Sequence, residues 1–84
     1  MNYRLLIALE VVEFLERLPA RHRRRLRGAI ESIHRDPRGS SDATETDETG
    51  RLVQIHVADD FALVYWIDDA DRHIKVLDLH AADR

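Results

Sequence analysis

The stretch that decides the fold is residues 51–80, RLVQIHVADDFALVYWIDDADRHIKVLDLH. It contains three runs rich in β-branched and aromatic residues, at 51–57, 61–68 and 73–80, and short acidic segments separate them. Such runs predict β-strands. The connections are only three and four residues long, whereas a parallel return needs a crossover of about a dozen residues or more. The three strands are therefore predicted to form antiparallel hairpins.

The first half of the chain is predicted to be helical after one short strand at residues 3–7. A helical spacing of apolar residues begins near residue 9 and ends at Leu18-Pro19, because the residue before proline is driven out of the α region. Proline is favoured in the first turn of a new helix, and a second apolar stripe follows until Asp36-Pro37. The two stripes consist of Val11, Phe14, Leu15 and Leu18, and of Leu26, Ala29, Ile30 and Ile33.

The order of these elements predicts one α+β domain over residues 1–84. Residues 38–50 are polar and contain no large apolar side chain, so they are predicted to form a mobile loop. The resulting order is β-α-α-β-β-β, a helical hairpin packed on a small antiparallel sheet, with the first strand joining the sheet after the helices cross over. The predicted core consists of Leu5, Ile7, Phe14, Leu18, Leu26, Ile30, Ile33, Val53, Ile55, Val57, Leu63, Tyr65, Ile67, Val76 and Leu77.

Composition excludes several classes of protein. The chain of 84 residues is 44% hydrophobic and has no cysteine, which favours a packed fold and excludes disulfides and thiolate metal sites. No apolar run reaches membrane-spanning length and no signal-peptide pattern precedes the fold, so we expect a cytoplasmic protein without membrane contact. No phosphate loop, dinucleotide fingerprint or metal-ligand spacing is present, so neither a cofactor nor a metal is expected. Asp68, Asp69 and Asp71 are interpreted as turn formers.

Positive charge is concentrated in one segment. Residues 17–38 hold eight arginines against two acidic residues, although the formal net charge of the whole chain is −3. Five of these arginines open the second predicted helix, where the helix dipole favours acidic side chains instead. Three interpretations remain open: a phosphate-binding surface for RNA, a surface for an acidic segment of a partner protein, and a solvated face paired with nearby glutamates. The five are Arg21, Arg23, Arg24, Arg25 and Arg27.

The chain has a break at Leu18-Pro19, a helix end at Asp36-Pro37, a FALVY run at 61–65 and a closing VLDLH at 76–80. Together with the order of the elements, these features resemble the RelE/ParE superfamily, toxins of bacterial type II toxin–antitoxin systems. The resemblance covers essentially the whole chain. It implies a toxin like those that stabilise plasmids, neutralised by a cognate antitoxin protein. It also implies one of two targets, the ribosome with its mRNA or DNA gyrase.

The chain departs from the family pattern at two arginine positions. The family's glycine–aspartate–tyrosine–arginine motif corresponds here to Asp59-Asp60-Phe61-Ala62, and its terminal histidine–arginine pair corresponds to His80-Ala81. Ala62 and Ala81 therefore stand where the family has arginines. Two hypotheses follow, a ribosome-dependent endoribonuclease that inhibits translation and a non-enzymatic binder, which is either a gyrase inhibitor or an inactive relative that binds an antitoxin.

An endoribonuclease needs a base for the ribose 2′-hydroxyl, a cation for the charge on the phosphate and an acid for the leaving oxygen. His56 and His80 are the titratable candidates on predicted strands, and Arg51 is the candidate cation. Tyr65 and Trp66 are candidates for stacking an unpaired base. The alternative interpretation is that both histidines are ordinary strand residues and both aromatic residues belong to the core.

Overall fold

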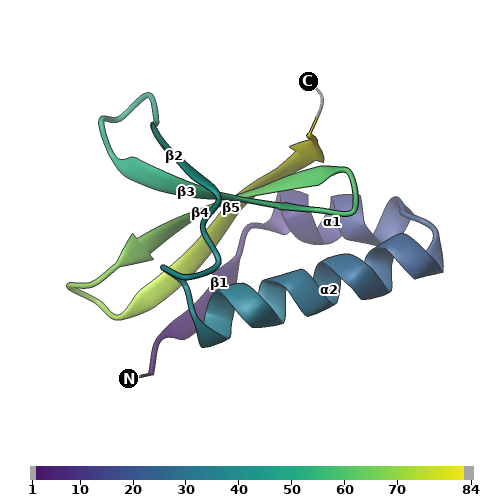
Figure 1. Cartoon of the computed structure of the whole chain (residues 1–84), viewed down its shortest axis with the longest axis horizontal. Coiled ribbons are helices and arrows are strands. Elements are labelled where there is room, and N and C mark those ends of the chain that lie inside the picture. The colour runs from purple at the N-terminus through teal and green to yellow at the C-terminus, as the bar shows by residue number, and fades with distance from the viewer. Residues whose placement is uncertain (1, 83–84) are drawn as a thin grey trace.

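The computed structural model describes residues 2–82 and contains two helices on one face of a five-stranded sheet (Figure 1). This arrangement confirms the α+β fold class. The strands lie in the order β1-β5-β4-β3-β2. The elements are β1 (Arg4–Ile7), α1 (Leu9–Arg17), α2 (Ala20–Arg35), β2 (Ala43–Thr46), β3 (Leu52–Ala58), β4 (Phe61–Asp68) and β5 (His73–Ala81).

The sheet is mixed, whereas the sequence predicted antiparallel pairing. β2, β3, β4 and β5 follow one another as antiparallel neighbours, as expected from their short connections. β1 instead pairs parallel with β5, from Arg4 opposite His73 to Ile7 opposite Val76. Parallel pairing requires a long connection between the two strands, and the rest of the fold provides it.

The polar segment 38–50 is not a loop throughout, because Ala43–Thr46 forms the edge strand β2. All four of its side chains are exposed, so backbone hydrogen bonds to β3 rather than burial hold it in place. Asp42 fixes the start of this pairing: its backbone N–H donates to the Ile55 carbonyl at 2.7 Å, and its carboxylate accepts from the Val57 N–H at 2.8 Å. The absence of apolar side chains concealed this strand from pattern analysis.

The predicted helix boundaries are confirmed. Leu18 is extended between the two helices, and Pro19 is the N-cap residue of α2. α2 ends before Asp36 and the buried Pro37. The carbonyl of Pro37 accepts a hydrogen bond of 2.6 Å from the hydroxyl of Tyr65, which ties the end of α2 to the middle of β4.

The core lies between the helices and the sheet. Of the predicted core residues, Leu26, Ile30, Ile33, Val53, Leu63, Tyr65 and Val76 are buried. Leu5, Ile7, Phe14, Leu18 and Ile67 are partly buried against the core cluster. Val57 is 50% exposed, so its assignment was wrong. Ile55 and Leu77 lie outside the cluster, and the buried residues that the prediction missed are Val11, Ala29, Ala62, Ile74 and Leu79.

An irregularity in the β4–β5 pairing explains part of this difference. Val64 pairs with Asp78 but Tyr65 pairs with Val76, so Leu77 is an extra residue on β5. A bulge of this kind reverses the alternation of side chains beyond it. Regular alternation from Ile74 and Val76 would place Asp78 in the core, whereas the bulge brings Leu79 there and leaves Asp78 on the other face. No helix in the part of the chain described here is long and apolar enough to cross a membrane.

Candidate nucleic-acid interface on the open face of the sheet

The sheet has two chemically different faces because successive side chains of a strand point in opposite directions. On β4, Leu63, Tyr65 and Ile67 belong to the core or pack against it, so they face the helices. Trp66 lies on the opposite face, which we call the open face, and is paired there with Lys75. Across β4 and β5 the open face carries Ala62, Val64, Trp66, Asp68, His73, Lys75, Asp78 and His80.

Trp66 is the centre of a cationic cluster on this face. The guanidinium carbon of Arg51 lies 4.6 Å from the centroid of the indole, and the ammonium nitrogen of Lys75 lies 4.9 Å from it. At these distances the quadrupole of the ring attracts both cations. We call Arg51, Trp66 and Lys75 the Trp66 cluster. It combines an aromatic platform with two positive charges, which are the groups that bind a nucleotide base and its phosphates.

Arg51 is also held from the β2–β3 turn. Its Nε donates to the Asp47 carboxylate at 2.9 Å. The Thr49 hydroxyl and the Arg51 groups lower the pKa of Asp47 to about 2, so this carboxylate is ionised at neutral pH. The charge of Arg51 is therefore partly balanced within the protein. Lys75 makes a looser ion pair, 3.5 Å from Asp68.

His80 occupies the other end of the open face. Its Nδ1 donates to the Asp78 carboxylate at 3.0 Å, which leaves Nε2 as the basic nitrogen of the neutral ring. The side chain is 44% exposed. His80 lies five positions after Lys75 on β5, which corresponds to roughly 15 Å along the strand. His80 and the Trp66 cluster therefore share a face but contact different parts of a bound chain.

His56 does not join this group. It pairs with Leu63 on the helix side of the sheet, and its Nδ1 donates to the Ser40 carbonyl at 2.6 Å. His56 and His80 consequently lie on opposite faces and cannot act together on one phosphate. Tyr65 is fully buried, so it cannot stack a base, and this part of the sequence interpretation is corrected.

The arginines of α2 lie on the helical side, away from the open face. Arg25 binds Asp59 in the β3–β4 turn at 2.9 Å, together with His22, and Arg23 donates to the Leu18 carbonyl at 2.8 Å. His22 and Arg25 thereby hold the pKa of Asp59 below its ordinary value. The Asp59 contacts fasten α2 to the sheet and the Arg23 contact fastens it to the end of α1, so the two arginines have a structural role.

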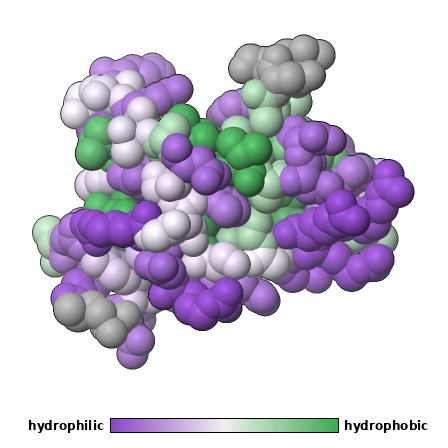
Figure 2. Space-filling model, in the orientation of Figure 1, coloured by the Kyte–Doolittle hydropathy of each residue, from purple (hydrophilic) through white to green (hydrophobic). Residues whose placement is uncertain are grey.

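The remaining arginines of the cluster, Arg21, Arg24 and Arg27, are exposed. Within residues 2–82, no ion pair joins them to a glutamate of α1 or to Glu31, so the pairing that one of the three interpretations proposed is not formed. Figure 2 shows the surface over this end of α2 as strongly hydrophilic, and green patches appear among the strands instead. The chain thus presents a basic helical surface and, separately, the open face.

Sequence reasoning missed Lys75 and Asp78 as members of the open face. Lys75 stands between Ile74 and Val76, and this alternation was the available signal that its side chain points away from the core. The same alternation could not predict that Asp78 lies on the open face, because the bulge at Leu77 shifts the side chains that follow it to the other face.

Comparison with known proteins agrees with this architecture. No protein-family model and no curated protein matches the sequence. Among solved structures, the archaeal RelE-RelB complex from Pyrococcus horikoshii OT3 matches with a TM-score of 0.75 and 29% identity. The match covers 100% of this chain and 99% of the other.

The molecule thus falls in the class of small α+β toxin folds. More narrowly, it is RelE/ParE-like over its whole length, which confirms the resemblance drawn from the sequence.

Proposed function

We propose that this chain is the toxin of a toxin–antitoxin pair and inhibits translation by cleaving mRNA on the ribosome. The whole-length likeness to a chain solved in a RelE-RelB complex supports the toxin class and an antitoxin protein as partner. The observation that carries the RNA assignment is the Trp66 cluster, which places an aromatic ring and two cations on the same face as the His80–Asp78 pair.

The chemistry follows from these groups. A base that stacks on Trp66 displaces one of its cations, and the displaced Arg51 or Lys75 is then available for the adjacent phosphate. His80 takes the proton of a ribose 2′-hydroxyl through Nε2, while Asp78 orients the ring and stabilises its positive charge. The 2′-oxygen attacks the neighbouring phosphorus, the bond to the 5′-oxygen breaks, and that oxygen receives a proton.

The 5′-oxygen takes its proton from water, because His56, the second histidine suggested by the sequence, lies on the other face of the sheet and His73 lies at the opposite end of β5 from His80. General acid or base catalysis by one side chain contributes about 10²–10⁴-fold. We therefore expect slower cleavage than an enzyme with two positioned groups would give. The basic surface of α2, with Arg21, Arg24 and Arg27, is proposed to hold ribosomal RNA while the open face meets the messenger.

A second function is favoured by different observations. Ala62 is 5% exposed and pairs with His80, so the position where the family has an arginine offers no charge to the open face. Arg51 is engaged by Asp47. These features support a non-enzymatic binder, either an inhibitor of DNA gyrase or an inactive relative that retains an antitoxin surface.

Induced expression in bacteria, with growth, bulk translation, mRNA integrity and DNA replication followed together, separates these functions. The ribonuclease predicts rapid arrest of translation with messenger cleavage, and its loss in His80→Ala and Trp66→Ala. His34→Ala is the histidine control, because His34 is an exposed residue of α2, on the helical side of the sheet, whose ring binds the Tyr3 carbonyl at 2.6 Å. Replication arrest that persists in His80→Ala contradicts the ribonuclease and favours the gyrase inhibitor. No effect on growth leaves the inactive relative.

A further inference from the structure

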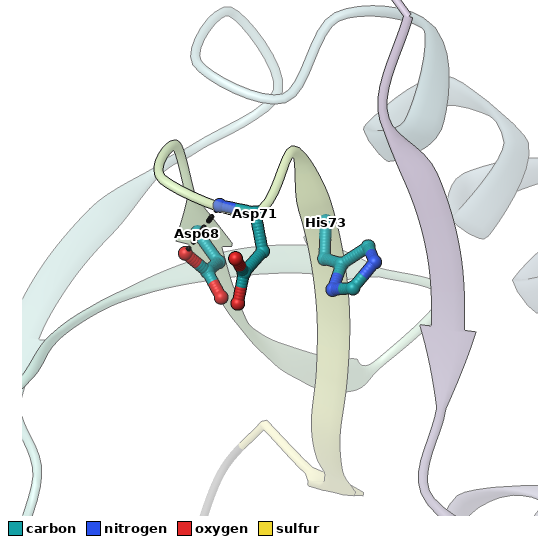
Figure 3. Close-up of side chains that lie close together, drawn as sticks. All are labelled: Asp68, Asp71 and His73. Carbon is teal, nitrogen blue, oxygen red and sulfur yellow. Dashed lines mark hydrogen bonds between the residues drawn. The ribbon is translucent and has the colours of Figure 1, made fainter.

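We propose that the β4–β5 hairpin binds one divalent transition-metal cation through Asp68, Asp71 and His73. The sequence suggested only turn-forming aspartates here. The structure adds an imidazole and brings one donor atom of each residue within 4.8 Å of the others. Figure 3 shows the two carboxylates side by side beneath the turn, with His73 on the far side of Asp71 from Asp68 and one ring nitrogen on the side nearer Asp71.

The three residues are positioned by the hairpin itself. Asp68 ends β4, Asp71 lies in the turn, and His73 begins β5 opposite Asp68. The Asp71 backbone N–H donates to Asp68 Oδ1 at 3.2 Å, which folds the turn so that both carboxylates approach each other. Two ionised carboxylates this close repel each other unless positive charge lies between them.

His73 provides the independent reason to place a ligand here. Within residues 2–82, its Nδ1 is a buried atom with no hydrogen-bond partner. Buried polar atoms are almost always paired, and an unpaired one in a native fold needs an explanation such as a bound ion. A cation between Nδ1 and the carboxylates satisfies the imidazole and removes the repulsion at once.

Neighbouring cations do not already fill this role. Lys75 lies 3.5 Å from Asp68 Oδ2, but its ammonium group is shared with the Trp66 ring. Arg72 lies over the ring of Tyr3, 5.5 Å from its centroid. Neither residue donates a hydrogen bond to Nδ1 of His73, which has no partner among residues 2–82.

The donor set indicates the kind of metal. One imidazole and two carboxylates suit Zn²⁺ or Mn²⁺ better than Ca²⁺ or Mg²⁺, which prefer oxygen ligands only. Ligand atoms lie about 2.0–2.2 Å from Zn²⁺, so donors around one ion are at most about 4.4 Å apart. A slight closure of the hairpin brings the three atoms to that spacing. A shallow pocket of about 360 Å³ that Asp71 and His73 help to line gives access for the ion and its water ligands.

The test is a titration of the complete, chelator-treated chain with ZnCl₂, measured by isothermal calorimetry. We expect one ion per chain, a rise in Tm on binding, and affinity reduced at least about tenfold in both Asp71→Asn and His73→Gln, since each removes one of three ligands. His34→Gln is the matched control and should bind as the unaltered chain does. Equal affinity in all four proteins, or saturation only at several ions per chain, would overturn the proposal.

A measurement on the unaltered chain covers the case in which a variant does not fold. The imidazole nitrogens of His73 are followed by NMR as Zn²⁺ is added. The proposal requires the large shift at Nδ1 of His73. A shift confined to other histidines, or no shift in any histidine, refutes it. MgCl₂ added in the same way should change nothing, and a response to Mg²⁺ equal to that to Zn²⁺ would contradict the assigned donor chemistry.

Discussion

Replacing Tyr65 with phenylalanine tests how the buried hydroxyl of β4 contributes to stability. Tyr65 is fully buried, and its hydroxyl donates to the Pro37 carbonyl at 2.6 Å. Phenylalanine keeps the ring, so the packing is nearly unchanged. The change removes the hydrogen bond and leaves a buried carbonyl unpaired, which costs about 1–3 kcal/mol. We therefore expect the free energy of unfolding to fall by about 2 kcal/mol at neutral pH.

The same change has a defined pH dependence. Burial, followed by the negative charges of Asp42 and Asp36, raises the pKa of Tyr65 to about 12 from an ordinary value of 10.0. Between these values the unfolded chain loses the phenolic proton and the folded chain keeps it. The stability of the unaltered protein therefore falls as the pH rises above 10, by about 1.4 kcal/mol per unit, and Tyr65→Phe lacks this loss. At about pH 11, one unit above the ordinary pKa of tyrosine, the advantage of about 2 kcal/mol should shrink by about 1.4 kcal/mol to below about 1 kcal/mol.

Urea unfolding of both proteins, monitored by the fluorescence of Trp66, measures both effects. Tyr3→Phe is the control, because the Tyr3 hydroxyl binds Asp69 at an exposed site and its loss should cost less. The reasoning is refuted if Tyr65→Phe is as stable as the unaltered chain at pH 7. It is also refuted if the difference between the two proteins does not change in alkaline solution.

Three further perturbations follow from the structure. Asp59→Asn should lower stability at neutral pH, because His22 and Arg25 hold the pKa of Asp59 below its ordinary 3.8. This contribution to stability is present above that value and is lost as the pH falls, so the urea midpoints of the variant and the unaltered chain should converge in acid. An unchanged midpoint at pH 7 would show that this link is unimportant. Gly50→Ala should cost about 1–2 kcal/mol in the same assay, because Gly50 has φ +87° and an added Cβ meets no atom within 4 Å, which leaves backbone strain as the only cost. Ile33→Ala should cost about 2–5 kcal/mol, since Ile33 is 0% exposed, and a loss below 1 kcal/mol would mean that the helices repack around the cavity.

The helix boundaries were predicted correctly because proline residues mark them. Pro19 and Pro37 restrict the backbone wherever they stand, so both ends of α2 were readable without knowledge of the tertiary structure. β2 offered no such signal. Its exposed Ala-Thr-Glu-Thr run is held by hydrogen bonds to β3, and those depend on where the partner strand lies.

The assignment of strand faces failed for a different physical reason. Val53, Ile55 and Val57 alternate as a buried face would, yet the pairing of β3 with β4 turns Gln54 and His56 toward the helices. Val53 is nevertheless buried, outside the main cluster, on the opposite side of the sheet. A sheet with apolar residues on both faces gives the same pattern in either register.

The candidate site was predicted in part. Arg51, Trp66 and His80 lie on one face, but Lys75 completes the group and His56 does not belong to it. Their common location depends on strand register and on the bulge at Leu77, which are properties of paired strands rather than of a single run of residues.

The parallel pairing of β1 with β5 sets the order of events during synthesis. β1 is made first, but its partner begins only at His73, so the nascent chain carries an unpaired strand until almost all of the fold has emerged. Contacts so distant in sequence form late because the intervening chain must first be brought together. Lys75 and His80 lie on that same final strand. The open face is therefore not assembled until β5 has been synthesised and has left the ribosome, so any activity that needs Lys75 and His80 begins only after that point.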